Sequence, residues 1–246
     1  MAGRTDTGPR PMNQDHFGWW PELGLFVVAD GMGGHNAGEV ASHLAVEAIH
    51  SFVAESAGSA DITWPFGLDV AASIELNRLM TAVRLANRRI FSEGGKHVEM
   101  SGMGTTVVAV LVEGDRAAMV SVGDSRIYRW RAERLEQLTA DDTWLASVLG
   151  HKEAEIADPA HPLRHVLTSV VGTRDDVIPA GREEQLLAGD TFVLCTDGVH
   201  GRLDAASVAR VLAANAGADK QAAGLVGEAI ARGTSDNATA VVLSVS

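Results

Sequence analysis

Short apolar runs alternate along the chain with longer segments in which apolar residues recur every three or four positions. The short runs predict buried strands, because β-branched and apolar side chains pack well on a pleated sheet. They cover residues 25–29, 105–112, 117–122, 126–130, 191–196 and 238–245. The longer segments have the period of amphipathic helices. They cover residues 38–54, 70–92, 205–214 and 220–231.

The order of these elements predicts an α+β fold. Runs 105–112, 117–122 and 126–130 follow one another through short turns, which join antiparallel neighbours, so we expect an antiparallel meander. Long helices beside such a meander favour layered α+β packing over a doubly wound parallel sheet. We expect one domain over residues 1–246, with the least regular stretch, about 140–182, forming a flap.

Composition narrows the possible functions. The chain has 246 residues, 46% of them hydrophobic, which is enough for one domain with a sizeable core. Its net charge of −12 argues against nucleic acid as a partner, because phosphates are neutralised by a basic surface. A single cysteine, Cys195, excludes an intrachain disulfide and suits a reducing cytoplasm. With no apolar run long enough to span a bilayer and no signal-peptide core, we expect no membrane insertion.

Aspartates stand at the ends of predicted strands, each beside a glycine or an asparagine. The pairs are Asp30-Gly31, Gly123-Asp124, Asp197-Gly198 and Asp236-Asn237. Turn conformation alone explains any one of them, and it is the better explanation for Asp190. If the four aspartates and Asp15 met at one end of the sheets, however, their charges would repel and divalent cations would relieve that repulsion.

Such a cluster would favour phosphoester hydrolysis. All-oxygen ligands select Mg²⁺, Mn²⁺ or Ca²⁺ and disfavour zinc. Two such ions roughly 3.5–4 Å apart can share a carboxylate and direct a hydroxide at a phosphoryl group. The segment Gly31-Met32-Gly33-Gly34 resembles a phosphate-binding loop, but it lacks the lysine and hydroxyl residue of a Walker motif.

Eight segments in sequence order resemble the metal-dependent protein phosphatase family, type 2C, in its bacterial form. They are Arg10-x-x-Asn13-Gln14-Asp15, Val28-Ala29-Asp30-Gly31-Met32-Gly33-Gly34-His35, Gly38-Glu39, Gly104-Thr105-Thr106, Val122-Gly123-Asp124-Ser125-Arg126, Leu138-Thr139-x-Asp141, Cys195-Thr196-Asp197-Gly198 and Ser235-Asp236-Asn237-x-Thr239. The resemblance implies a four-layer α/β/β/α sandwich, in which two antiparallel sheets are flanked by helices. It also implies a serine/threonine phosphatase with two core Mn²⁺ or Mg²⁺ ions and a possible third.

The resemblance assigns a role to each matching residue. The metal ligands would be Asp30, Gly31 through its carbonyl, Asp124, Asp197 and Asp236, and the catalytic residues would be Arg10, Asp15 and Asp30. Asp30 would bridge the two core ions, and Asp124 would hold the third. Asp15 would orient metal-bound water, while Arg10 would bind phosphate through its fork of donors.

Three positions depart from the family pattern. Gln14 occupies a position often filled by glutamate, a common bacterial variant that removes one charge near the metal ligands. Met32 replaces a histidine that many members use as a general acid, so the leaving group must be protonated from elsewhere. Asp142 stands where histidine is frequent, which puts details of the flap in doubt.

The expected partners are phosphorylated proteins in signal transduction, including a serine/threonine kinase or its targets, and we expect a cytoplasmic monomer. A catalytically weak module that binds phosphoproteins is the alternative, although the intact ligand set argues against it. A structural Ca²⁺ domain is a further alternative, but the aspartates do not fall in one compact loop.

Overall fold

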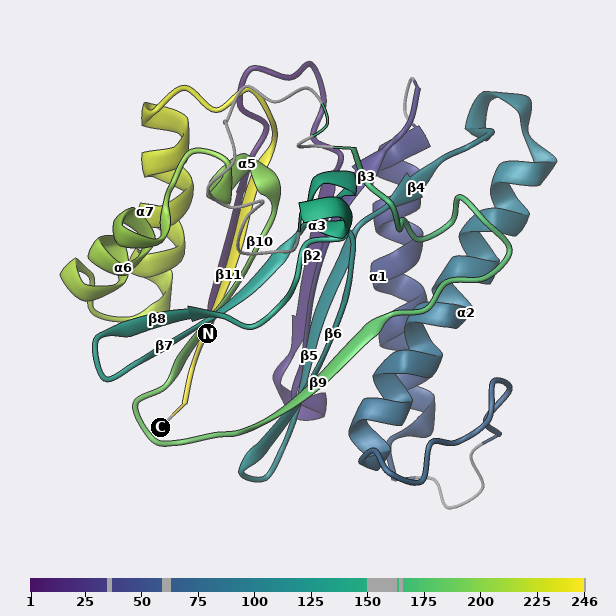
Figure 1. The fold of residues 1–246 in the computed structure, drawn as a ribbon, viewed down its shortest axis with the longest axis horizontal. Coiled ribbons are helices and arrows are strands. Elements are labelled where there is room, and N and C mark those ends of the chain that lie inside the picture. The colour runs from purple at the N-terminus through teal and green to yellow at the C-terminus, as the bar shows by residue number, and fades with distance from the viewer. Residues whose placement is uncertain (35–36, 59–62, 150–162, 164–165, 246) are drawn as a thin grey trace.

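Two antiparallel sheets pack face to face between two layers of helices (Figure 1). The structure is a computed structural model that describes residues 1–34, 37–58, 63–149, 163 and 166–245. One sheet has the strand order β1-β11-β10-β7-β8, and the other has the order β2-β3-β5-β6-β9 with β4 paired to β3. The expected four-layer α/β/β/α sandwich is thereby confirmed.

All strands of both sheets pair in antiparallel fashion. The five-stranded sheet consists of β1 (Ala2–Asp6), β11 (Ala238–Ser244), β10 (Thr191–Cys195), β7 (Arg126–Arg131) and β8 (Arg134–Gln137). The other sheet consists of β2 (Asp15–Trp20), β3 (Leu25–Met32), β5 (Val107–Glu113), β6 (Arg116–Val122) and β9 (Ala180–Gln185), with β4 (Gly104–Thr105) beside β3.

Helices cover the outer face of each sheet (Figure 1). The pair α1 (Ala37–Ser56) and α2 (Ile74–Lys96) lies on the sheet that contains β3, and α6 (Ala205–Ala214) and α7 (Ala218–Ala231) lie on the other. The described part of the chain also contains η1 (Pro21–Leu23), η2 (Val98–Met100), α3 (Trp144–Leu149) and α5 (Asp197–His200). Helix α2 begins later than the expected residue 70, because the Ser73 hydroxyl caps it by accepting from the Leu76 amide. No helix in the described ranges is both long and apolar enough to cross a membrane.

The alternation of side chains along β3 fills two layers of core at once. Leu25 and Val27 face the layer packed on α1 and α2, whereas Phe26 and Val28 face the layer between the sheets. Because both faces are buried, β3 has an uninterrupted apolar sequence instead of alternating apolar and polar residues. Cys195 is buried in a third cluster, beneath α6 and α7, as expected from its apolar neighbours.

The prediction of a three-stranded meander over residues 105–130 is wrong for the third strand. Strands β5 and β6 pair as expected, but β7 pairs with β10 and β8 in the opposite sheet. The chain changes sheet at Gly123, which has a φ of 96°. A Cβ there would lie 2.6 Å from the Cγ2 atom of Thr106, so a larger residue would be obstructed as well as strained. Asp124 therefore sits on the connection between the two sheets.

Part of the expected flap lies outside the described residues, namely 150–162 and 164–165. Of the rest, α3 and an irregular segment from residue 166 precede β9. Residues 180–182, which the sequence assigned to the flap, belong to β9 and pair with β6.

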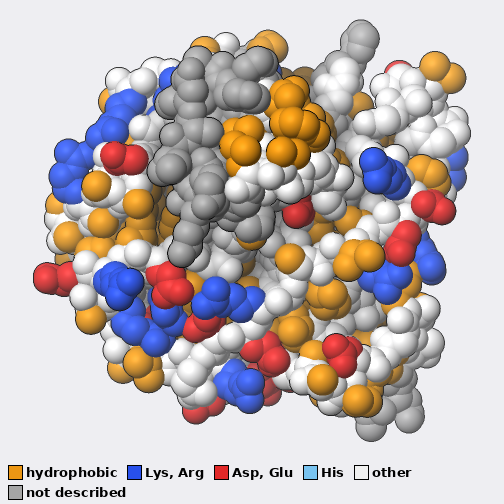
Figure 2. Space-filling view, in the orientation of Figure 1, with side chains coloured by type: hydrophobic (Ala, Val, Ile, Leu, Met, Phe, Trp, Pro, Cys, Tyr) orange, Lys and Arg blue, Asp and Glu red, His pale blue; other side chains and the backbone are white. Residues whose placement is uncertain are grey.

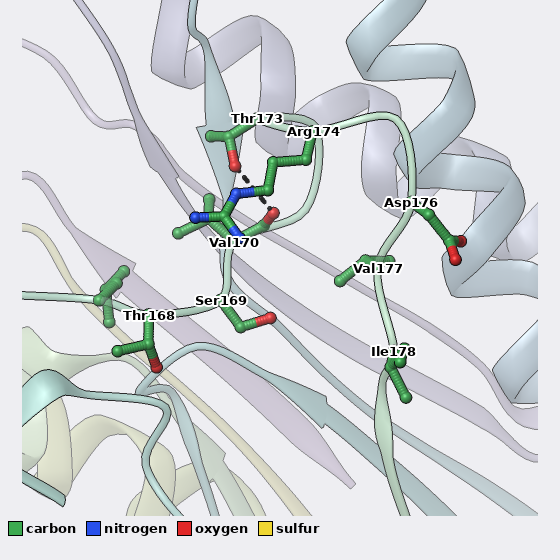
Figure 3. A pocket seen from close by; sticks show the side chains of 9 residues that line it. Thr168, Ser169, Val170, Thr173, Arg174, Asp176, Val177 and Ile178 are labelled. Atoms are coloured by element: carbon green, nitrogen blue, oxygen red, sulfur yellow. Dashed lines mark hydrogen bonds between the residues drawn. The ribbon is translucent and has the colours of Figure 1, made fainter. Parts of the chain in front are cut away.

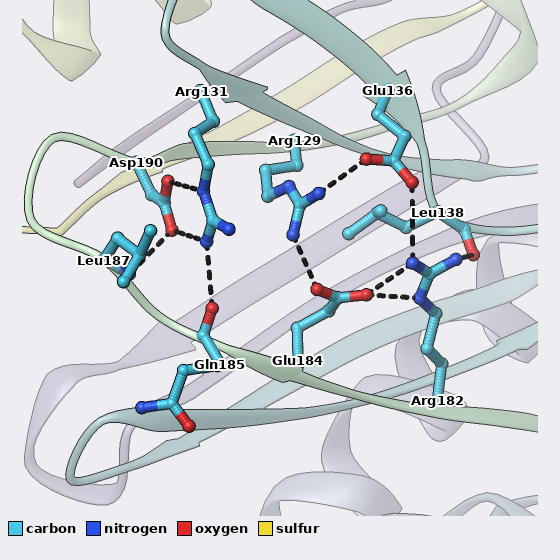
Figure 4. Close-up of polar contacts among 9 residues, drawn as sticks. All are labelled: Arg129, Arg131, Glu136, Leu138, Arg182, Glu184, Gln185, Leu187 and Asp190. Atoms are coloured by element: carbon cyan, nitrogen blue, oxygen red, sulfur yellow. Dashed lines mark hydrogen bonds and ion pairs between the residues drawn. The ribbon is translucent and has the colours of Figure 1, made fainter.

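A network of ion pairs joins the two sheets along β7, β8 and β9 (Figure 4). Arg129 on β7 contacts Glu136 of β8 at 2.5 Å and Glu184 of β9 at 2.6 Å. The Nε atom of Arg182 donates to Glu184 at 2.6 Å. Figure 2 shows basic and acidic side chains interleaved over this part of the surface. The network supplies a polar connection at one edge of the layer between the sheets, whose core is a cluster of apolar side chains.

Replacing Arg129 should destabilise the fold. The side chains of Arg129 and Glu184 are each only 14% exposed, so Arg129→Ala removes one of the two guanidinium groups that contact a poorly solvated carboxylate. We expect the free energy of unfolding to fall by about 1–3 kcal/mol in urea titrations. Glu136→Gln, at a side chain that is 44% exposed, is the control and should cost less than about 1 kcal/mol. Equal effects of the two substitutions would contradict this role for Arg129.

Candidate metal centre

The first two acidic residues of the site face each other across neighbouring strands. Asp15 begins β2 and is paired in register with Asp30 of β3. The amide of Gly31 donates to the Gln14 carbonyl at 3.0 Å, which fixes the end of this strand pair. A Cβ on Gly31 would lie 2.0 Å from the Gly38 carbonyl oxygen, so only glycine allows α1 to start so close to Asp30.

Two further aspartates come from the opposite sheet. Asp197 begins α5 directly after β10, and Asp236 lies just before β11, which pairs with β10. A Cβ on Gly198 would lie 1.8 Å from the Asn237 carbonyl oxygen, so the segments that carry the two aspartates are in close contact. The fifth, Asp124, arrives on the crossing between the sheets.

The five carboxylates act on one another electrostatically, although Asp15 and Asp124 are buried while Asp30, Asp197 and Asp236 are half-buried. Burial raises the pKa of Asp30 well above its usual range, and the charges of Asp15, Asp197, Asp124 and Asp236 raise it further. Burial likewise raises the pKa of Asp15 to about 7, with contributions from Asp197 and Asp236. The pKa of Asp124 rises to about 8, first through burial and then through the charge of Asp197. The acidic residues singled out in the sequence are thus brought together.

The described side chains are not arranged in the geometry of a complete metal site. Among the residues that the structure describes, no three His, Cys, Asp or Glu side chains are grouped closely enough to hold an ion. Asp236 is engaged by Arg10, whose Nη2 atom lies 2.6 Å from Asp236 Oδ2 while its Nε atom donates to the Ser235 carbonyl. The expected phosphate-binding residue therefore contacts an expected metal ligand.

Asp15 carries a buried oxygen that suits an additional ligand. Its Oδ2 atom accepts hydrogen bonds from the hydroxyls of Thr239 at 2.6 Å and Thr196 at 2.9 Å. Its Oδ1 atom is buried and accepts none from the described residues. Because leaving a buried carboxylate oxygen without a partner is costly, this atom marks a place for a bound cation or its water. The residues present therefore fit divalent cations.

Asn237 fixes the loop that carries Arg10. Its Nδ2 atom donates to the carbonyls of Thr7 and Met12, at 2.8 and 2.9 Å. Its Oδ1 atom accepts from the Gln14 amide at 2.8 Å. The sequence showed Asn237 only as part of a motif, because a side chain that bridges residues more than 220 positions away leaves no local pattern.

Residues of two other motifs meet to position Asp124. Arg126 donates to both carboxylate oxygens of Asp141, at 2.9 and 2.7 Å. Asp142 accepts from the Gly123 amide through Oδ2 and donates its own amide to the Gly123 carbonyl. The sequence contained both motifs, but it assigned no positioning role to Arg126, Asp141 or Asp142.

Thr105 and Thr106 hold the backbone of Asp30. The Thr106 amide and the Thr105 hydroxyl both donate to the Asp30 carbonyl at 2.8 Å. The Asp30 amide donates in turn to the Thr106 hydroxyl at 3.1 Å. These bonds leave the Asp30 carboxylate free to act as a ligand, and they explain the Gly-Thr-Thr segment noted in the sequence.

A buried carboxylate cluster between two antiparallel sheets, flanked by outer helices, is the architecture of metal-dependent protein phosphatases. The chain belongs to the protein phosphatase 2C family, whose model matches residues 3–224.

Relatives with assigned names support this membership. The chain is 33% identical over 247 residues to serine/threonine protein phosphatase PstP of Mycobacterium tuberculosis. The alignment covers 99% of this chain and 44% of the relative. The chain therefore spans less than half the length of that relative. It is 29% identical over 245 residues to serine/threonine phosphatase stp of Listeria innocua. That alignment covers 98% of this chain and 93% of the relative.

Solved structures show the same fold. The catalytic domain of PstP in complex with two manganese ions superposes with a TM-score of 0.82 at 31% identity, covering 98% of this chain and 95% of that one. Serine/threonine phosphatase Stp1 of Staphylococcus aureus superposes with a TM-score of 0.83 at 27% identity, covering 100% and 94%.

Without metal, the protein should lose stability as the pH rises. Asp15 and Asp124 have folded-state pKa values of about 7 and about 8, above the value of about 3.9 in an unfolded chain. The folded state therefore holds protons that the unfolded state has released, and the free energy of unfolding declines from about pH 4 to about pH 8. Thermal unfolding in EDTA should show this decline.

Two comparisons isolate the cause. Saturating Mn²⁺ should reduce the slope with pH, because bound cations replace the protons. The double variant Asp15→Asn, Asp124→Asn should also flatten the slope in EDTA, which separates these groups from general acidic repulsion. A melting temperature that rises steadily from about pH 5 to about pH 8 in EDTA would contradict the assignment.

Proposed function

We propose that this chain is a metal-dependent serine/threonine protein phosphatase that hydrolyses phosphoserine and phosphothreonine esters. The observation that carries the proposal is that aspartates from both sheets lie close enough for the charges of Asp15, Asp124, Asp197 and Asp236 all to oppose the ionisation of Asp30. A site that raises the energy of its own carboxylates in this way is suited to binding cations. The names of the relatives agree with this chemistry.

The metal ligands in this proposal are the side chains of Asp30, Asp124, Asp197 and Asp236 and the carbonyl of Gly31. Their oxygen atoms suit Mn²⁺ or Mg²⁺. When bound, two such ions lower the pKa of a water molecule and polarise a phosphoryl oxygen. Asp30 lies at the centre of the group, because all four other carboxylates act on its pKa. This position suits a ligand shared by two ions.

Asp15 is proposed to orient the attacking water. Two threonine hydroxyls hold its Oδ2 atom, and its buried Oδ1 atom accepts no hydrogen bond from the described residues. Its pKa is about 7 in the metal-free protein, and bound cations would lower this pKa and keep the carboxylate ionised, ready to accept a hydrogen bond from water. Met32, whose side chain has no proton to donate, cannot serve as the acid for the leaving group.

Arg10 is proposed to bind the substrate phosphate by exchanging partners. Its side chain is 51% exposed and reaches the edge of the carboxylate cluster. When cations occupy the site, Asp236 is neutralised by its own metal, and the guanidinium becomes available to pair with phosphate oxygens. The metal-free ion pair thus keeps Arg10 close to where the phosphate would bind.

The wider biological role follows from the same proposal. Its substrates would be phosphorylated proteins in signal transduction, including a serine/threonine kinase or its targets. We propose a cytoplasmic monomer that does not use nucleic acid as a partner. Residues 1–246 would form one catalytic domain, with a flap beside the substrate that begins at about residue 140 and ends before β9.

Loss of the central carboxylate tests the function. Asp30→Asn should lower Mn²⁺-dependent hydrolysis of a phosphothreonine peptide by on the order of 100-fold or more, because it removes charge at the shared ligand without changing core volume. Asp219→Asn, at an exposed aspartate of α7, is the matched control and should keep full activity. Circular dichroism should show both variants folded. Binding of the phosphopeptide without any Mn²⁺-dependent turnover by the wild type would favour the regulatory module instead.

Replacing Arg10 should affect the substrate and the metal in opposite directions. Arg10→Ala should raise the KM for phosphopeptide while largely preserving kcat, since the phosphate contact exists before the transition state as well as in it. Mn²⁺ should bind at least as tightly as in the wild type, because Asp236 no longer has a competing partner. Steady-state kinetics and calorimetry measure these two effects. Weaker Mn²⁺ binding in a folded Arg10→Ala variant would contradict the proposed exchange of partners.

A further inference from the structure

A cavity of about 490 Å³ lies along the irregular segment that precedes β9 (Figure 3). Its lining consists of Leu167, Thr168, Ser169, Val170, Thr173, Arg174, Asp176, Val177 and Ile178. None of these residues belongs to the carboxylate cluster, and none was singled out by the sequence motifs.

The wall of this cavity is hydrogen-bonded to both halves of the metal centre. The Thr168 amide donates to the carbonyl of Asp142, the residue that holds the turn before Asp124. Val171 exchanges two backbone hydrogen bonds with Thr105, at 2.9 and 3.0 Å. The hydroxyl of Thr105 donates to the Asp30 carbonyl. A ligand in the cavity would therefore lie close to the proposed catalytic site.

The far end of the wall is fixed to α2. Asn87 accepts from the Gly172 amide at 2.6 Å and donates to the Arg174 carbonyl at 3.0 Å. Gly172 has a φ of 96°, and a Cβ there would lie 2.2 Å from Ile90 Cγ2, so this close approach requires glycine. The backbone that carries Arg174 is thus held in place before any ligand binds.

Arg174 presents a cation that has no side-chain partner among the described residues. Its guanidinium lies near Thr173 and Val170 in Figure 3 and makes no ion pair or side-chain hydrogen bond within the described part of the chain. The acidic residue of the wall, Asp176, points away from it toward α2 and pairs with Arg84 at 3.0 and 3.1 Å. Ile178, also in the lining, is 83% exposed. The cavity thus combines one available guanidinium with an accessible apolar side chain.

We propose that this cavity binds an acidic residue of the phosphoprotein substrate, close in sequence to the phosphorylated residue. The Arg174 guanidinium would pair with the carboxylate, and the Ser169 hydroxyl could donate to it. Ile178 would contact a neighbouring side chain of the substrate. Because the protein as a whole carries a charge of −12, a local cation is needed to attract an acidic peptide segment. This inference rests on the proposed phosphatase function and makes Arg174 a specificity-determining residue.

The test uses phosphothreonine peptides in which one aspartate is moved along either flank, each paired with an asparagine version. For the wild type with Mn²⁺, at least one aspartate position should lower KM relative to its asparagine partner. Arg174→Ala should raise KM for that peptide about tenfold, the effect of losing one charge-assisted contact, with kcat unchanged. KM for the asparagine peptide and turnover of p-nitrophenyl phosphate should stay at wild-type values. Arg174→Lys should restore part of the preference.

The control is Arg134→Ala, which removes an exposed arginine at the β7–β8 hairpin and should leave the kinetics with all substrates unchanged.

Peptide binding measured by fluorescence anisotropy tests this inference separately from the proposed phosphatase function. If the wild type hydrolyses no peptide but still binds the aspartate peptide through Arg174, the phosphatase assignment fails and the acidic subsite stands. If hydrolysis is normal and Arg174→Ala changes both peptides equally or neither, the subsite is refuted. Tighter binding of free inorganic phosphate than of the aspartate peptide at Arg174 would likewise overturn it.

Discussion

Mutual repulsion among buried aspartates is the constraint on which the rest of the structure depends. Burial alone disfavours the ionised form of Asp30, and each neighbouring carboxylate disfavours it further. Without cations, the protein can relieve this energy only by retaining protons or by bringing in a cation of its own. It does the second at one position, where Arg10 contacts Asp236. The apolar layers on both sides of the sheets must offset what remains, and they do so with strands that are buried on both faces.

The polar residues around the cluster hold its backbone more than its charges. Thr105, Thr106, Asp142 and Asn237 all bond to main-chain groups of the segments that carry the acidic residues or Arg10. Donors placed on the carboxylates themselves would lower their pKa values, but they would also compete with a metal. Backbone anchoring fixes the geometry and leaves most of the negative charge available. Asp15 and Asp236 do carry donors: two threonine hydroxyls bond one oxygen of Asp15, while Arg10 and the Asn237 amide bond Asp236. The bonds to Asp15 leave its other oxygen to orient water.

The sequence predicted the central parts of this fold better than its edges. Strand β3 is strongly apolar because both of its faces are covered, so its pattern was clear. Strand β2 contains a histidine, a glycine and two tryptophans and lies at a sheet edge, so no simple period marked it. The crossing at Gly123 was misread because a short turn serves a hairpin or a change of sheet equally well. Only the pairing of β7 with β10, nearly 70 residues away in sequence, distinguishes the two. The cluster itself was predicted through the ordered motifs, whereas the bond between Arg126 and Asp141 depends on folded geometry.

Thr105 would connect the proposed substrate subsite to the proposed catalytic site. Its side chain bonds the Asp30 carbonyl, and its backbone bonds Val171 beside the cavity that contains Arg174. A contact made by Arg174 would exist both before and during the reaction, so it can contribute to affinity but not selectively to the transition state. In the proposed mechanism, selective stabilisation comes from groups that meet the changing charge of the phosphoryl centre, and those groups would lie at the aspartate cluster. Because one hydrogen-bonded segment carries both regions, affinity gained in the cavity can place the phosphate at the cluster without requiring the cluster itself to rearrange.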